Sequence, residues 1–214
     1  GDLDDDGDDE IAVGAILNRY AYVYFGDPAF DATPDLVLSG ETADDRFGYA
    51  IVRAGDFNHD GFDDLLVGAI HNDTAAYDAG RAYLYYGSPS PDPIPDVKFT
   101  GEAYRDLFGR ALAGPGDLNG DGIDDVVIGS PTPDTGGFGP GRAYVFLGGV
   151  AGSPRLPDNQ PDLVLDGEYA SDRFGCHING AGDFDGDGRP EFVLGANLYG
   201  DGGLLRRGKF YVLG

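Results

Sequence analysis

Short runs in which apolar and polar side chains alternate recur along the whole chain. The clearest are aromatic-rich and end in glycine: NRYAYVYFG (18–26), GRAYLYYG (80–87), GRAYVFLG (141–148) and RGKFYVLG (207–214). β-Branched and aromatic residues dominate such runs, while Gly, Pro, Asn and Asp separate them, and no segment sustains a helical period. The pattern predicts an all-β protein with few helices.

A longer unit contains these runs and occurs four times. The sequences GDLDDDGDDEIAVGAI, GDFNHDGFDDLLVGAI, GDLNGDGIDDVVIGSP and GDFDGDGRPEFVLGAN begin at residues 1, 55, 116 and 182. Each precedes one aromatic run, and three of them follow a Phe-Gly pair that is itself preceded by a run of the DLVLSGE type. A full unit therefore holds four short strands. Four-stranded antiparallel units repeated at this spacing are typical of a β-propeller.

The predicted blades span approximately residues 1–40, 41–101, 102–167 and 168–214 of a single domain, 1–214. The first unit has no strand one and the last has no strand four, so we expect fourteen strands with two incomplete blades. Open sheet edges invite pairing with other chains. We therefore expect an arc of a larger propeller, or a propeller closed by further propeller chains.

The loop at the start of each repeat carries oxygen-bearing side chains at alternate positions, numbered here from its first Asp. Positions 1, 3 and 5 are Asp or Asn, position 6 is Gly, and position 9 is Asp or Glu. Ca²⁺ takes roughly six to eight oxygen ligands, which such a curled loop supplies, and the carbonyl of position 7 adds one. We expect about four Ca²⁺ ions. The expected ligands are Asp2, Asp4, Asp6, Asp8 and Glu10; Asp56, Asn58, Asp60, Phe62 and Asp64; Asp117, Asn119, Asp121, Ile123 and Asp125; Asp183, Asp185, Asp187, Arg189 and Glu191.

The pattern of these loops allows two other interpretations. An EF-hand needs a bidentate Glu at position 12 and flanking helices, but position 12 is Val13, Val67, Ile128 and Leu194. Ordinary acidic hairpin turns remain an alternative, which four copies in register disfavour. Ca²⁺ is favoured over Mg²⁺ because several carboxylates in an all-protein cage suit the larger ion.

Together, Phe-Gly, the GDxNxDGxxD loop, the GAI, GSP or GAN triplet and GRAYLYYG resemble the FG-GAP repeat of integrin α-subunit propellers. This resemblance covers essentially the whole chain. It implies a seven-bladed propeller in integrins, with calcium in the hairpin between strands one and two of certain blades. It also implies that ligands bind on the face opposite the calcium loops.

That opposite face would carry the connections from strand two to three and from strand four to the next strand one. Variable loops on a rigid scaffold are the usual place for recognition. Either the aromatic and histidine side chains there contact a protein or glycan ligand, or they pack their own loops. These side chains are Tyr77, Tyr104, Tyr169, Tyr199, Phe138 and His71.

Composition narrows the function. A formal net charge of −24 argues against nucleic acid, and no apolar run is long enough for membrane insertion. No nucleophile–base pair or zinc set converges, so we do not expect an enzyme. We expect a calcium-stabilised extracellular or cell-surface module for binding or adhesion. The alternatives are a lectin, a structural subunit of a surface filament, or an accessory domain of a secreted enzyme.

Overall fold

The computed structural model describes residues 1–26, 31–132, 139–150, 160–200 and 207–214. In these ranges the chain forms fourteen strands in four antiparallel sheets, and it forms no helix. The all-β prediction is confirmed. No helix in the described ranges has the length and apolarity that crossing a membrane requires.

Each sheet is one blade, with its strands paired in chain order. Blade 1 contains β1 (Ile11–Ala15), β2 (Tyr20–Tyr24) and β3 (Leu36–Ser39). Blade 2 contains β4 (Phe47–Gly55), β5 (Asp64–Ala69), β6 (Arg81–Tyr85) and β7 (Val97–Thr100). Blade 3 contains β8 (Ala111–Gly116), β9 (Asp125–Ser130), β10 (Arg142–Phe146) and β11 (Leu163–Asp166). Blade 4 contains β12 (Phe174–Gly182), β13 (Glu191–Ala196) and β14 (Lys209–Leu213).

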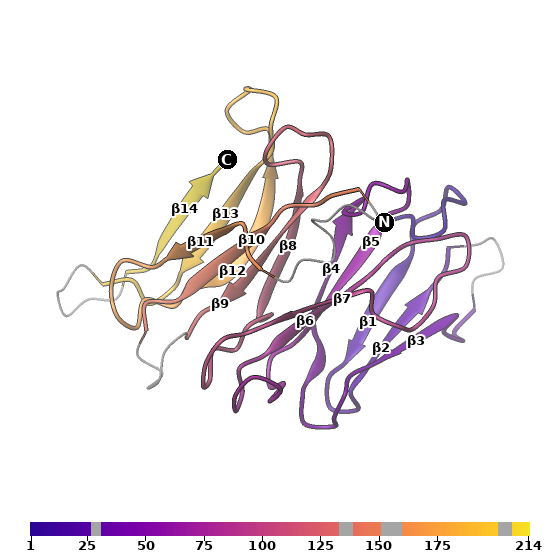
Figure 1. The fold of residues 1–214 in the computed structure, drawn as a ribbon, viewed down its shortest axis with the longest axis horizontal. Coiled ribbons are helices and arrows are strands. Elements are labelled where there is room, and N and C mark those ends of the chain that lie inside the picture. Colours follow the sequence, from indigo (N-terminus) through magenta and orange to yellow (C-terminus); the bar gives the residue numbers. More distant parts are fainter. Residues whose placement is uncertain (27–30, 133–138, 151–159, 201–206) are drawn as a thin grey trace.

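The blades lie in chain order, with blades 1 and 4 at opposite ends of the molecule (Figure 1). The core is divided among the three interfaces between neighbouring blades. Examples are Val23, Leu38 and Val67 between blades 1 and 2, Leu66, Phe99 and Ile128 between blades 2 and 3, and Val127, Ala143 and Leu194 between blades 3 and 4. This arrangement of packed antiparallel blades, two of four strands and two of three, confirms the predicted propeller architecture.

The second strand of an inner blade is buried on both faces, which explains its unbroken apolar sequence. All six residues of β5 are buried. Because successive side chains point to opposite faces of a sheet, Val67 packs toward blade 1 and Leu66 toward blade 3. β9 shows the same complete burial.

The Phe-Gly pairs anchor the start of the inner strands. Each Phe is buried and meets a Tyr of the same blade edge-on. The ring centroids are 5.4 Å apart for Phe47–Tyr83, 5.3 Å for Phe108–Tyr144 and 5.0 Å for Phe174–Tyr211. All three phenylalanines belong to the core between blades.

Candidate metal sites and the opposite face

Each acidic loop is curled by hydrogen bonds to its first Asp. In loop 1 the Asp2 carboxylate accepts the N–H groups of Asp6 at 3.1 Å and Gly7 at 3.0 Å. Gly7 has a φ of 95°, which glycine adopts without steric cost. The corresponding bond to the position-6 glycine recurs in loops 2, 3 and 4. Alternate side chains of the loop consequently converge on its concave side.

In loops 1 and 4 this curl gathers four carboxylates. Two groups have ligand oxygens that all lie within 4.8 Å of one another. They are Asp2, Asp4, Asp6 and Glu10, and Asp183, Asp185, Asp187 and Glu191. Such a set of hard, negatively charged oxygen donors fits Ca²⁺, and the carbonyl of position 7 would add a further ligand.

Glu10 shows the fit most clearly. Its Oε2 accepts the backbone N–H of Leu3, whereas its Oε1 is buried and has no hydrogen-bond partner. Burial raises the pKa of the Glu10 carboxyl, and the nearby charges of Asp4 and Asp2 raise it further. A buried oxygen without a partner is costly, and a cation among these carboxylates would satisfy it.

Loops 2 and 3 carry Asp at position 9, and the shorter side chain lies differently. Asp64 accepts the N–H groups of Phe57 at 3.0 Å and Gly87 at 2.9 Å, one on each oxygen. Asp125 does the same in loop 3, with Leu118 and Gly148, both at 2.8 Å. Burial raises the pKa of Asp64 to about 8 and that of Asp125 to about 6.

The position-9 acids of loops 2 and 3 therefore tie their loop to the end of strand three. Sequence reasoning missed this role, although the glycine that ends each aromatic run supplies the N–H donor. These two loops also place an amide beside an acid, since the Asn58 amide donates to Asp60 at 2.8 Å and that of Asn119 to Asp121 at 3.1 Å.

Neighbouring loops are joined by the acid at position 8, a residue the sequence did not single out. The Asp2 N–H donates to Asp63 of loop 2 at 2.9 Å. The Asp56 N–H likewise donates to Asp124 of loop 3 at 3.0 Å. Loop 4 has Pro190 at this position.

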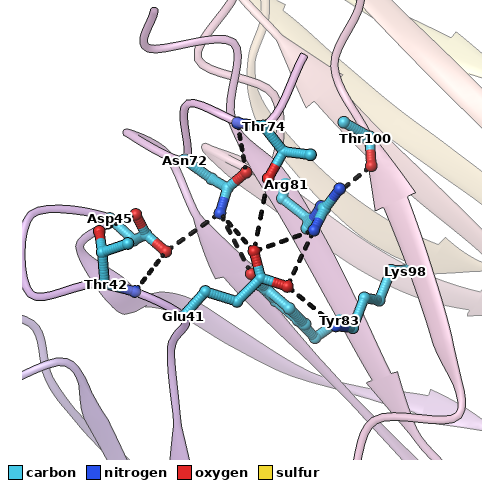
Figure 2. A network of polar contacts seen from close by, with 9 residues as sticks. All are labelled: Glu41, Thr42, Asp45, Asn72, Thr74, Arg81, Tyr83, Lys98 and Thr100. Atoms are coloured by element: carbon cyan, nitrogen blue, oxygen red, sulfur yellow. Dashed lines mark hydrogen bonds and ion pairs between the residues drawn. The ribbon is translucent and has the colours of Figure 1, made fainter. Parts of the chain in front are cut away.

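On the other side of the blades, a glutamate from each inter-blade connection meets a cation of the next blade. Glu41 accepts from Arg81 at 2.9 Å, from Lys98 at 2.8 Å and from Asn72 at 3.2 Å (Figure 2). Burial by itself would raise the pKa of Glu41. The hydrogen bonds from Lys98 and Asn72 and the charge of Arg81 outweigh it, so the pKa of Glu41 is lowered. The same tie recurs between Glu102 and Arg142 at 3.1 Å and between Glu168 and Lys209.

The predicted aromatic side chains of this face occur in pairs. Tyr77 and Tyr104 stack with centroids 5.6 Å apart, and the Arg105 guanidinium lies 5.7 and 5.2 Å from the two rings. Tyr169 and Tyr199 meet edge-on at 5.6 Å. Each pair links a two-to-three connection with a connection between blades.

Tyr77 and Tyr104 pack against each other and still remain 52% and 42% exposed. His71 Nδ1 lies 3.6 Å from a carboxylate oxygen of Asp78, the residue that follows Tyr77 in the chain. Phe138 lies outside the described residues.

Comparison with known families agrees with this geometry. The model of the FG-GAP repeat matches residues 47–85, 108–146 and 178–213, which together make up more than half of the chain. The chain belongs to the FG-GAP repeat family. The three matches run from β4 to β6, from β8 to β10 and from within β12 to β14, and the acidic loop of each lies between its first two strands.

Curated relatives of this FG-GAP chain are integrin α subunits. Integrin alpha-5 of Xenopus laevis is 32% identical over 206 residues, which cover 92% of this chain and 19% of the relative. Integrin alpha-IIb of Mus musculus is 36% identical over 74% of this chain and 16% of its own length. Integrin alpha-PS2 of Drosophila melanogaster is 30% identical, over 92% and 14%. The chain spans less than a fifth of the length of these relatives.

Proposed function

We propose that this FG-GAP chain is a calcium-stabilised binding module of an adhesion protein that works outside the cell or at its surface. Calcium binding is supported above all by the cluster of four carboxylates in loop 1, in which the buried Oε1 of Glu10 has no hydrogen-bond partner. Similarity to integrin α subunits over most of the chain supports the adhesive role. Extracellular calcium is millimolar, so even weak loop sites would fill there.

In this proposal the loop side chains bind the ion, and the bound ion stabilises the hairpin that contains the loop. The Asp or Asn side chains at positions 1, 3 and 5, the carbonyl of position 7 and the acid at position 9 would be the ligands in all four loops. Without a cation, repulsion among the gathered carboxylates opposes the curl. Bound calcium would cancel this repulsion and brace the loop against the blade.

The ligand surface lies on the side of the blades where Glu41 contacts Arg81 and Lys98, a cluster called the Glu41 tie below. The stacked Tyr77 and Tyr104 with Arg105 form an exposed, pre-ordered patch, which suits protein recognition because Tyr and Arg are enriched at binding hot spots. The same exposed rings could stack on a sugar. If the chain binds glycans on an array and Tyr104→Ala abolishes that binding, the ligand is a glycan and not a protein.

The calcium proposal is tested by thermal unfolding and calcium titration of the wild type and two variants. Glu10→Gln removes one predicted ligand charge, whereas Asp5→Asn removes a charge at non-ligand position 4 of the same loop, where φ is 58°. We expect calcium to raise the melting temperature of the wild type, by mass action. Glu10→Gln should weaken one site at least about tenfold, because a charged ligand of the cage is lost.

Asp5→Asn is the matched control and should bind calcium nearly as well as the wild type. Equal melting temperatures of the wild type in calcium and in chelator would refute the proposal. If Glu10→Gln and Asp5→Asn lose the same calcium affinity, loop 1 attracts calcium only through its overall charge and not through specific ligands.

A further inference from the structure

The position-8 acid of one loop reaches the first ligand residue of the loop before it. Asp124 Oδ2 accepts the backbone N–H of Asp56 at 3.0 Å, so a carboxylate of loop 3 holds the start of loop 2. Asp56 is the predicted position-1 ligand of loop 2, and Asp124 directly precedes Asp125, the predicted position-9 ligand of loop 3. One hydrogen bond thus connects two candidate metal sites.

A second hydrogen bond joins the same two loops through the backbone. Asp125 Oδ1 accepts the N–H of Gly148 at 2.8 Å. The next residue, Gly149, donates its N–H to the carbonyl of Phe57, at position 2 of loop 2, at 2.9 Å. Positions 1 and 2 of loop 2 are therefore both held by blade 3, and both connections lead to the last two acids of loop 3.

Loops 1 and 2 are connected in the same way. Asp63 Oδ2 accepts the N–H of Asp2 at 2.9 Å, and the Asp63 N–H donates to the Asp2 carbonyl at 3.2 Å. Arg53 fixes the Asp63 carboxylate, with its Nε 2.7 Å from the same oxygen. The Ser88 N–H also donates to the Leu3 carbonyl at 2.8 Å. The connection is therefore a recurring feature of neighbouring repeats.

The connection between loops 3 and 4 differs at the decisive residue. The glycine before loop 2 makes room for the acid, since a Cβ at Gly55 would overlap the Asp124 carboxylate. At the corresponding place before loop 3, a Cβ at Gly116 would instead meet Cγ of Pro190 at 3.3 Å. The Pro190 side chain has no hydrogen-bond acceptor, so it cannot hold the N–H of Asp117.

Two ions that order the same stretch of backbone assist each other. Calcium in loop 3 would order the segment that carries Asp124, and through Asp124 the start of loop 2. Loop 2 then loses less conformational freedom when its own ion binds. Repulsion between the two ions acts in the opposite direction, but each ion would lie among carboxylates, and salt at about 0.15 M screens such repulsion over about 8 Å.

We propose that Asp63 and Asp124 are positioning residues that make calcium binding by loops 1, 2 and 3 cooperative, whereas loop 4 binds its ion independently. This inference rests on the proposed calcium function and adds its regulation. Neither acid is a predicted ligand. Because a coupling free energy is reciprocal, each filled loop raises the affinity of its neighbour by the same factor.

Tryptophan reporters make it possible to measure one loop at a time, because the chain contains no Trp. Phe62→Trp and Ile123→Trp place an indole at position 7 of loop 2 and of loop 3. Each reporter chain is titrated with Tb³⁺, a luminescent substitute for Ca²⁺ that emits when a nearby excited Trp transfers energy to it. Competition with Ca²⁺ then gives the calcium affinity of the reporting loop.

One neighbouring loop is inactivated in each reporter chain by replacing the acids at positions 1 and 5. Loop 3 is inactivated by Asp117→Asn with Asp121→Asn, and loop 4 by Asp183→Asn with Asp187→Asn. Loop 3 with loop 4 is the matched control pair, because its position-8 residue is proline.

Inactivation of loop 3 should lower the calcium affinity of loop 2 at least about fivefold. In Asp124→Ala the same inactivation should change the affinity of loop 2 less than about twofold. If Asp124 only stabilised the fold, Asp124→Ala would lower this affinity and leave the effect of loop 3 intact. Inactivation of loop 4 should leave the calcium affinity of loop 3 unchanged.

The outcomes separate this inference from the calcium proposal. If neither Tb³⁺ nor Ca²⁺ changes the emission of the Phe62→Trp chain, the calcium proposal fails and this inference fails with it. If loop 2 binds calcium equally well with loop 3 active or inactivated, or if the effect of loop 3 persists in Asp124→Ala, this inference alone is overturned. An equally large effect of loop 4 on loop 3 would also overturn it, because the position-8 acid would then be unnecessary.

Discussion

Among single residues, the buried acid Asp106 of the connection between blades 2 and 3 carries a pH dependence that the loop pattern does not reveal. Asp106 is 1% exposed, its Oδ2 accepts the N–H groups of Glu102 and Ala103, and its Oδ1 has no partner. Burial raises the pKa of Asp106 to about 6. The folded chain therefore favours the protonated form. The contribution of the Asp106 carboxyl to stability is complete below about pH 4 and is lost as the pH rises through about 6.

Asp106→Asn should remove this dependence, because the amide is neutral at every pH. When the pH rises from about 4 to about 7, the unfolding free energy of the variant minus that of the wild type should increase by on the order of 2 kcal/mol. Urea unfolding of both proteins at the two pH values measures the difference, and effects of the acidic loops cancel in it. A difference that does not change with pH would contradict the assignment.

Asp172→Asn is the control for that experiment. Both Asp172 oxygens accept backbone N–H groups, from Tyr169 at 2.9 Å and Gly200 at 3.2 Å. The amide nitrogen of Asn would face one of these donors. This variant should therefore lose stability at both pH values, as expected when a buried donor loses its acceptor.

At the level of elements, the Glu41 tie joins the connection after blade 1 to strands β6 and β7 of blade 2 (Figure 2). Glu41→Gln keeps the shape but removes the charge that Arg81 and Lys98 share. We expect a loss of about 1–2 kcal/mol in dilute buffer and less in about 1 M salt, because the pairs are partly exposed. Denaturant unfolding at the two salt concentrations tests this.

Lys98→Met isolates one arm of the tie and should cost less than Glu41→Gln. Arg81 is the more buried partner and donates twice to Glu41, so most of the interaction survives in that variant. Stability of Glu41→Gln equal to that of the wild type at both salt concentrations would show that the tie contributes nothing.

The elements themselves were predictable because each one repeats. Alternation and the Phe-Gly pairs located the strands of all four blades, and the position-6 glycines located the curled loops. The second role of Asp64 was not predictable, because its donor Gly87 is 23 residues away and is set by strand pairing. Likewise, the partners of Glu41 lie 31 to 57 residues away. Repetition reveals local conformation, whereas partners across strands and blades follow from packing.

For the whole molecule, stability should vary along the arc, because each blade packs only against its neighbours. The interface of blades 2 and 3 is filled by aromatic rings, with Phe99 and Phe146 centroids 4.4 Å apart. Between blades 3 and 4 the counterparts Leu165 and Leu213 line a cavity of about 310 Å³. Blades 1 and 4 each have one neighbour in the described structure. Cooperative opening should therefore begin at the ends and reach blades 2 and 3 last.

Amide hydrogen exchange in calcium tests this order directly. β5 and β9, buried along their whole length, should exchange slowest, and β1 and β14 should exchange fastest among the strands. Uniform protection across the four blades would contradict a neighbour-by-neighbour core.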